Sequence, residues 1–322
     1  MSIRNAPIPC RSAPWLAAAA LGLAACAPAD PSLNRPNGVA VAPDGSLLVV
    51  DKNHYRVVRI DRGGQFLQSF GGLGNRPRNL PAPYDIDLGP DGCIYVCDRS
   101  YSRTGDYKDH DGVKVFAPDG RFLREIGGTD YRPGEPNNGP YGLDVDAEGH
   151  VWIADYHANR IRHYDAAGNL VHTFGKPGSG PGELSGPNDV AVDRNRGVVY
   201  VLEAINARVQ ALSLDGEPQV QFGGYGRGPE ELSYPQYLDL DPDGNLYVSD
   251  MGNRRIQKFS PDGRLLGSLG LPEGDGDLQL MGLTVRRVAA GSGFRQEVLA
   301  ADTLNNRILI FEDEVGLRGT VG

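Results

Sequence analysis

Short apolar runs that end in an acidic residue recur along almost the whole chain. In each run four residues, mostly β-branched, aromatic or leucine, are followed by Asp or Glu. Runs of this kind, bounded by turn-forming residues, are typical of buried β-strands. The six runs end at Asp51, Asp98, Asp155, Glu203, Asp250 and Asp302. These acids are spaced 47, 57, 48, 47 and 52 residues apart, which indicates a repeated unit.

A glycine ends each unit at a similar spacing. This second set of residues gives evidence for the repeat that is independent of the acids. These glycines are Gly71, Gly127, Gly175, Gly223, Gly270 and Gly322. Within a unit we predict four short strands, joined by tight turns such as Pro43-Asp44-Gly45. Four antiparallel strands repeating at this period are typical of a propeller blade. The sequence therefore predicts an all-β fold, a six-bladed β-propeller of four-stranded antiparallel blades, whose last blade takes its own outer strand from residues 316–322.

Recurring motifs connect these units with a known family. Pro-x-x-Val-Ala-Val, Leu-Tyr-Val-x-Asp and Asn-x-Arg-Ile recur from residue 36 to the end of the chain and resemble the NHL repeat. The resemblance implies an NHL-like propeller. Propellers of this family include protein and peptide binders, sensor domains and an amidating lyase, so the resemblance does not select one function.

The N-terminus has the layout of a bacterial secretory signal. Residues 1–14 carry Arg4 and Arg11 and no acid, and an apolar run over 15–25 ends in Leu23-Ala24-Ala25-Cys26. This ending resembles a lipobox, whose cysteine receives a diacylglycerol and commonly palmitate. We expect a signal peptide over 1–25, an acylated Cys26 opening a short tether over 26–34, and the propeller over 35–322. An ordinary signal peptide with an incidental cysteine is the alternative.

The expected cellular location of the protein is the cell envelope. Ala27 follows the cysteine where lipoproteins of the inner membrane usually carry Asp. In a Gram-negative host this resemblance implies the periplasmic face of the outer membrane. The chain has a net charge of −9 and no cluster of Lys or Arg, which argues against a nucleic-acid partner. We expect a monomeric propeller that binds a protein or peptide.

Five blades place an arginine five residues after the acid, and we interpret each pair as a structural ion pair. Blade 2 differs, because nine extra residues within 99–111 put Gly112 where the arginine belongs. Asp98 is therefore expected to lack its usual partner and to be available for recognition. Surface loops often carry binding residues, which favours a role of this insertion in recognition. The alternative is a solvated variation of the loop without a binding role. The predicted partner-binding residues of this insertion are Asp98, Arg99, Tyr101, Tyr107 and His110.

The first strand of each blade should line a central channel. The residue after its leading proline is expected at the rim, where Tyr, Asn and Gln side chains suit a small ligand or peptide. The predicted ligand-binding residues are Asn37, Tyr84, Tyr141, Asn188, Gln236 and Tyr237.

Carboxylates farther along the same strands raise the question of a metal. Asp85, Asp87, Asp144, Asp189 and Asp239 could hold Ca²⁺ near the axis. The alternative, which we favour, is that they accept hydrogen bonds from neighbouring backbone amides. His54, His110 and His157 lie in loops of consecutive blades and suggest Zn²⁺, but they lack close ligand spacing. The sequence requires no cofactor.

Two functions remain open. The first is a membrane-anchored, extracytoplasmic binding or assembly module that engages a protein or peptide through its face of long loops. The second is an enzyme, either resembling an amidating lyase or acting as a metal-dependent hydrolase or lactonase at the channel mouth. We favour the first, since the chain has no Gly-x-Ser-x-Gly or His-Glu-x-x-His motif. The amidating lyase also carries zinc histidines after the leading prolines, where this chain has none.

Overall fold

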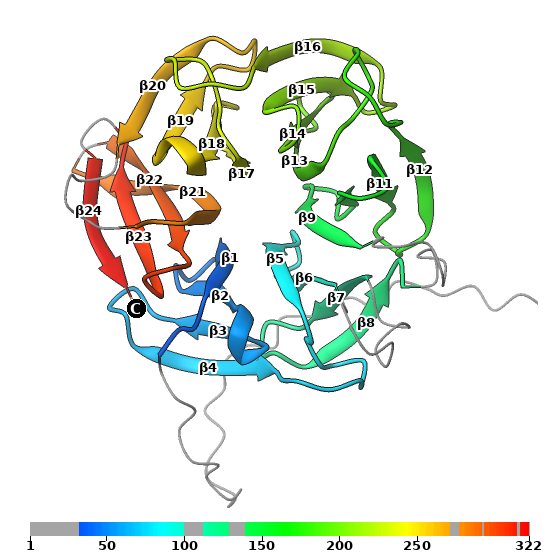
Figure 1. Ribbon diagram of the computed structural model, residues 1–322. Coiled ribbons are helices and arrows are strands. Elements are labelled where there is room, and N and C mark those ends of the chain that lie inside the picture. Colours follow the sequence, from blue (N-terminus) through cyan, green and yellow to red (C-terminus); the bar gives the residue numbers. More distant parts are fainter. Residues whose placement is uncertain are drawn as a thin grey trace, which may run out of the picture.

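A computed structural model shows six β-sheets arranged as blades around a central axis (Figure 1). The structure describes residues 32–99, 112–128, 139–270, 277–291 and 293–313, together with the backbone of 316–321. Each sheet has four strands, which follow one another in chain order from the axis outwards. The predicted all-β, six-bladed propeller is confirmed. None of the helices in the described part of the chain has the length and apolar character needed to cross a bilayer.

The strands of blades 1 to 3 follow one pattern of lengths. Blade 1 contains β1 (Pro36–Val41), β2 (Leu47–Asp51), β3 (Arg56–Ile60) and β4 (Phe66–Gly71), with the 3-10 turn η1 (Lys52–His54) between β2 and β3. Blade 2 contains β5 (Pro83–Leu88), β6 (Ile94–Asp98), β7 (Gly112–Phe116) and β8 (Phe122–Ile126). Blade 3 contains β9 (Pro140–Val145), β10 (Val151–Asp155), β11 (Arg160–Tyr164) and β12 (Leu170–Phe174).

Blades 4 to 6 repeat this order. Blade 4 contains β13 (Pro187–Asp193), β14 (Val198–Glu203), β15 (Arg208–Ser213) and β16 (Pro218–Gly223). Blade 5 contains β17 (Pro235–Leu240), β18 (Leu246–Asp250), β19 (Arg255–Phe259) and β20 (Leu265–Gly270), with η2 (Met251–Asn253) between β18 and β19. Blade 6 contains β21 (Leu280–Ala290), β22 (Gly293–Asp302), β23 (Arg307–Glu312) and β24 (Gly316–Val321).

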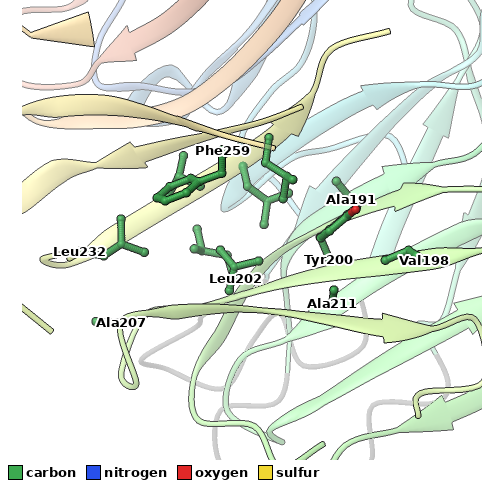
Figure 2. Packing of buried hydrophobic residues seen from close by; sticks show 12 residues of the cluster. Ala191, Val198, Tyr200, Leu202, Ala207, Ala211, Leu232 and Phe259 are labelled. Carbon is green, nitrogen blue, oxygen red and sulfur yellow. The ribbon is translucent and has the colours of Figure 1, made fainter. Parts of the chain in front are cut away.

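The hydrophobic core lies between the blades. The second strands are buried on both faces, which explains their continuous apolar sequence. Figure 2 shows the cluster between blades 4 and 5, where Leu202 and Tyr200 of β14 approach Phe259 of β19. Equivalent clusters of described residues occur at the other five blade junctions. Each blade therefore depends on both neighbours for burial.

The ring closes by packing between blades 6 and 1. Val39 and Val49 of blade 1 share a cluster with Leu299 and Ile308 of blade 6. The outer strand of blade 6, β24, pairs with β23 of the same blade. The prediction that the last blade supplies its own outer strand is confirmed.

The predicted ion pair between the acid and the arginine is confirmed in five blades. The arginine Nε donates to the acid over 2.7 Å for Arg56–Asp51 and 2.8 Å for Arg255–Asp250. The other pairs are Arg160–Asp155, Arg208–Glu203 and Arg307–Asp302. The acid also holds the segment that leads into its own blade, since Asp250 accepts the backbone N–H of Ser233 at 2.6 Å. These contacts place the linkers and the loops after the second strand on one side of the disc, here called the long-loop face.

Blade 2 has a structural cation of its own, so the expectation that Asp98 lacks a partner is wrong. Lys114, in the middle of β7, donates to Asp98 over 2.5 Å, and both side chains are fully buried. Residues two apart in a strand point to the same face, so Lys114 takes over the role of the arginine that Gly112 replaces. Arg162 and Gln257 occupy the equivalent position and also donate to the acids of their blades. Because Asp98 is buried, it cannot contact a partner directly.

Candidate ligand site at the channel mouth

Glycines let the inner strands approach one another closely around the axis. A Cβ on Gly142 of β9 would lie 2.1 Å from Oδ1 of Asp189 and 2.7 Å from the backbone oxygen of Asn188. A Cβ on Gly38 or Gly282 would likewise meet the backbone of the next inner strand. The channel is therefore narrow at this level, since any side chain there would push two blades apart.

Tyr237 bridges the channel below its mouth. Its hydroxyl, supplied by blade 5, donates toward Oδ1 of Asn37 in blade 1 at 3.1 Å and the carbonyl oxygen of Tyr84 in blade 2 at 3.2 Å. A phenol has one hydrogen, so these two acceptors share it. Tyr237 is 3% exposed, and the contact separates an outer mouth on the long-loop face from an inner cavity.

The inner cavity is lined by the five predicted aspartates. Each accepts a hydrogen bond from the backbone of the next blade: Asp87 from Val145 at 2.7 Å and Asp239 from Val285 at 2.7 Å. The remaining bonds are Asp85–Leu143, Asp144–Val192 and Asp189–Leu238. The aspartates thus join neighbouring blades, as in the alternative favoured from the sequence.

Burial raises the pKa of these aspartates. The pKa of Asp85, Asp87 and Asp239 rises to about 7, because burial and the nearby carboxylates both disfavour the charged form. Burial and the charge of Asp87 hold the pKa of Asp144 well above its ordinary value. Several of these groups therefore retain protons at neutral pH.

The cavity does not present the features of a built metal site. It offers water-sized molecules about 50 Å³, which suits a few waters and not a peptide or a drug-sized ligand. Both carboxylate oxygens of Asp87 already accept backbone hydrogen bonds, from Leu88 and Val145. Within the described ranges, no group of three or more His, Cys, Asp or Glu side chains is arranged to hold a metal ion. The aspartates therefore fit a role in joining blades better than a role as Ca²⁺ ligands.

Three tyrosines form an aromatic stack at the mouth. Tyr84 of β5 and Tyr141 of β9 lie at the first positions after the leading prolines, with ring centroids 5.1 Å apart. Tyr156, from the loop after β10, stacks on Tyr141 at 4.6 Å and 27°. All three are partly exposed, and the rings of Tyr84 and Tyr141 are tilted by 45° to each other, so the group offers aromatic edges and faces to a ligand.

Arg99 organises the polar groups beside this stack. Its guanidinium lies 4.8 Å from the centre of the Tyr141 ring, donates to the Tyr141 hydroxyl oxygen, and donates to Nε2 of His157 at 2.9 Å. Because arginine only donates, Nε2 of His157 must be the unprotonated nitrogen. Partial burial and the charge of Arg99 lower the pKa of His157, which favours this neutral form. The Tyr141 O–H and the His157 Nδ1–H are left to donate to a ligand.

Lys52 adds a second cation from the neighbouring blade. It follows β2 directly, and its Nζ lies 3.7 Å from the centre of the Tyr84 ring. Lys52 and Arg99 therefore stand over two tyrosines that contact each other. We call Lys52, Tyr84, Arg99, Tyr141, Tyr156 and His157 the mouth cluster.

The structure divides the predicted rim residues into two groups. Tyr84 and Tyr141 lie at the mouth, as expected. Asn37 and Asn188 are 1% and 5% exposed, so they lie in the channel wall rather than on an open rim, as does Tyr237. Asn188 donates to the carbonyl oxygen of Gln236, which is itself partly exposed. The side chains of Asn37, Asn188 and Tyr237 thus make contacts between blades.

Of the two predicted partner-binding residues that the structure describes, Asp98 and Arg99, only Arg99 belongs to the mouth cluster. Tyr101, Tyr107 and His110 lie outside the described residues. His54 contacts Asp51 at 2.8 Å and His157 contacts Arg99, so these two histidines of the zinc hypothesis serve different contacts. The sequence interpretation did not assign Lys52 or Tyr156 to the site. Each lies directly after the acid of its blade, in blades 1 and 3, and this position could have identified them in the sequence.

With this geometry established, sequence comparison agrees with the repeat. Residues 33–60 and 137–164 match the NHL repeat. The chain is 28% identical over 141 residues to the protein brain tumor of Drosophila melanogaster, covering 44% of this chain and 12% of that protein. It is 31% identical over 144 residues to a probable peptidyl-alpha-hydroxyglycine alpha-amidating lyase of Caenorhabditis elegans, covering 42% of this chain and 39% of that protein. The chain thus spans well under half the length of either relative.

Solved structures share the architecture of this six-bladed propeller. A streptogramin B lyase superposes with a TM-score of 0.61 at 14% identity, over 90% of this chain and 83% of the lyase. A gluconolactonase from Xanthomonas campestris superposes with a TM-score of 0.59 at 15% identity, over 84% of each chain. At such identities the similarity establishes the fold alone.

Proposed function

We propose that this protein is a binding module that captures an anionic group, such as a peptide carboxylate, at its mouth cluster. The observation that carries the proposal is the concentration of positive charge and hydrogen-bond donors there. Arg99, Lys52 and the Tyr141 hydroxyl all present positive charge or a hydrogen-bond donor to the same space. The acids at the ends of the nearby second strands are already paired, as Asp51 with Arg56 and Asp98 with Lys114. A carboxylate would accept from the Tyr141 O–H and the His157 Nδ1–H, next to the charges of Arg99 and Lys52.

Exposed apolar side chains on the same face support a peptide or protein as the carrier of that group. Ile205 is 62% exposed and lies near Tyr156, since a Cβ on Gly186 would touch both side chains. Tyr225 and Tyr234, on the linker between blades 4 and 5, are 72% and 59% exposed. Such residues, on the same face as the charged mouth cluster, suit a partner with apolar side chains close to its anionic group.

The proposed module is tethered to the cell envelope through acylated Cys26. The lipobox-like ending of the apolar run supports this part of the proposal, and an outer-membrane position follows from Ala27 if the host is Gram-negative. A nine-residue tether would hold the disc near the membrane, and residues 99–111 of blade 2 would extend its recognition surface.

A peptide with an aromatic C-terminal residue tests the binding site. The peptide is compared with its C-terminal amide by isothermal titration calorimetry on the full chain. We expect the free carboxylate to bind at least about ten-fold more tightly, because the amide loses the charge-assisted contacts. Equal affinity for the two peptides would overturn the proposal.

Two variants locate this binding. Tyr141→Phe keeps the aromatic stack and removes one donor, and Arg99→Ala removes the charge; both should weaken carboxylate binding. Arg196→Ala is the matched control, because Arg196 lies in the turn after β13, away from the mouth, where its Nη1 donates to Asp193. If Arg196→Ala weakens binding as much as Arg99→Ala, the effect is one of net charge and the mouth is not the site.

The second candidate is a propeller lyase. It is supported by the similarity to a probable amidating lyase over 144 residues. In that case the mouth cluster would orient the substrate, with Tyr141 and His157 as its proton-transfer groups.

Activity and metal content distinguish the two candidates. The purified protein is incubated with a peptidyl-α-hydroxyglycine, and release of the peptide amide is followed by mass spectrometry. Turnover that Tyr141→Phe abolishes would favour the lyase. Stoichiometric zinc or calcium that is lost in Asp144→Asn or Asp189→Asn would favour a metal-dependent enzyme. Binding of the carboxylate peptide without turnover would favour the module.

A further inference from the structure

Lys52 differs from the other described lysines in having no acidic partner. Lys114 pairs with Asp98, Lys176 with Glu183 and Lys258 with Asp313. Among the described residues, Nζ of Lys52 makes neither an ion pair nor a hydrogen bond, and its contact is with the face of the Tyr84 ring. The neighbouring acid, Asp51, is occupied by Arg56, His54 and the backbone N–H of Asn34.

The surroundings of Lys52 raise the fraction of its side chain that is uncharged at neutral pH. The side chain is partly buried, and two other cations, Arg35 and Arg99, lie close enough to repel its charge. Burial, assisted by these charges, lowers the pKa of Lys52 from 10.5 to about 8. An amine with this pKa is roughly one-tenth neutral at pH 7, about 300 times the neutral fraction of an ordinary lysine. A neutral amine is a nucleophile, whereas the ammonium ion is not.

The position of Lys52 relative to Arg99 defines what could react with it. Lys52 stands over Tyr84, Arg99 stands over Tyr141, and the two rings are in contact. A short ligand whose carboxylate lies beside Arg99 and accepts from the Tyr141 O–H would extend across these rings toward Lys52. We propose that Lys52 is a nucleophilic amine that forms a reversible imine with a ligand carrying both a carboxylate and an aldehyde or ketone. The carboxylate part of this inference rests on the proposed function.

The chemistry requires no further reagent. The lone pair of neutral Nζ attacks the carbonyl carbon, a C–N bond forms, and the carbonyl oxygen takes up a proton. The resulting carbinolamine loses that oxygen as water, and the two hydrogens of the amine balance the water that leaves. No atom is oxidised or reduced. The imine, once protonated, is a cation that can remain over the Tyr84 ring.

Reductive trapping on the full chain tests the proposal. The protein is treated with limiting glyoxylate and borohydride, which converts an imine into a stable secondary amine, and the labelled lysine is found by peptide mapping. Lys176 is the internal control, because its side chain is 72% exposed and paired with Glu183. We expect Lys52 to be labelled at least about ten-fold faster than Lys176, with a rate that rises with pH to a plateau above about pH 8. Labelling of Lys52 at or below the rate of Lys176 would overturn the proposal.

A neutral aldehyde and two variants separate this inference from the anion site. Propionaldehyde has no carboxylate, so it should label Lys52 more slowly than glyoxylate, and Arg99→Ala should remove that difference. Lys52→Arg keeps a cation over Tyr84 but has no nucleophilic amine, so it should abolish the adduct. If both aldehydes label Lys52 equally fast, the nucleophile stands and the anion site fails. If the peptide binds and Lys52 is no more reactive than Lys176, the anion site stands and the nucleophile fails.

Discussion

Lys114 and Asp98 form a fully buried ion pair in blade 2, with Nζ 2.5 Å from Oδ2. The cation has moved two residues along the third strand, from the position of Gly112 to that of Lys114, and has stayed on the same face. Asp98 also accepts the backbone N–H of Ala82 at 2.8 Å, so it holds the linker into blade 2 as Asp250 holds the linker into blade 5. The blade thus keeps the structural contact of its neighbours despite its longer loop.

Asp98→Ala should therefore destabilise the propeller strongly. The change leaves the ammonium of Lys114 buried without a counter-charge, which costs about 3–5 kcal/mol. Thermal melts should show a loss at least as large as that of Asp250→Ala, at about 2–4 °C per kcal/mol. The double variant Asp98→Asn/Lys114→Met should recover much of the loss because no charge is stranded. A single variant that melts like the parent protein would refute the structural role of Asp98.

Asp144→Asn should make stability less dependent on pH. The pKa of Asp144 is raised in the folded state, so between pH 3.8 and the higher folded value the folded protein binds more protons than the unfolded chain. Stability from this group is full below about pH 4 and is lost as the pH rises. Asparagine keeps an acceptor for Val192 and carries no charge, so the variant should gain stability relative to the parent on going from about pH 5 to about pH 8.

Thermal melts of both proteins at these two pH values measure this difference. Asp215→Asn, at an exposed turn, is the matched control and should follow the parent protein. Parallel behaviour of Asp144→Asn and the parent would mean that Asp144 is ionised in the folded state.

Gly142→Ala should weaken the junction between blades 3 and 4. The added Cβ would lie 2.1 Å from a carboxylate oxygen of Asp189 and 2.7 Å from backbone atoms, so the inner strands must move apart. Overpacking of this kind costs about 1–3 kcal/mol. Gly267→Ala is the control, since its Cβ in β20 would meet no atom within 4 Å. Chemical denaturation should show a loss for Gly142→Ala alone, and equal stabilities would contradict the close approach of these strands.

Cys26→Ser should release the protein from the membrane fraction. The serine hydroxyl does not replace the thiol in lipid transfer, so metabolic labelling with an alkyne palmitate should also be lost. Cys10→Ser, within the expected signal peptide, should leave both properties unchanged. A parent protein whose intact mass shows another N-terminus and no lipid would contradict the anchor.

Local sequence chemistry was sufficient to predict the blades. Apolar second strands, tight turns and the acid–arginine pairs all involve residues within one unit, and each recurs at a readable spacing. The contact of Arg255 with Asp250, for example, spans five residues and one loop. The sequence interpretation of Asp98 was wrong because its partner lies at a different position of the third strand. Lys114 is 16 residues from Asp98 and follows the insertion.

The sequence by itself therefore determined the number of blades, their strand order and the acids that hold them, since these depend on short-range periodicity. Only the tertiary structure decided which residues meet across the ring. Tyr237 reaches Asn37, 200 residues away, because the closure of blade 6 on blade 1 brings their inner strands to one narrow axis. Lys52, Arg99 and Tyr141 likewise come from three consecutive blades and share no sequence motif. Their proximity follows from the convergence of neighbouring blades on the axis, and a linear pattern does not record it.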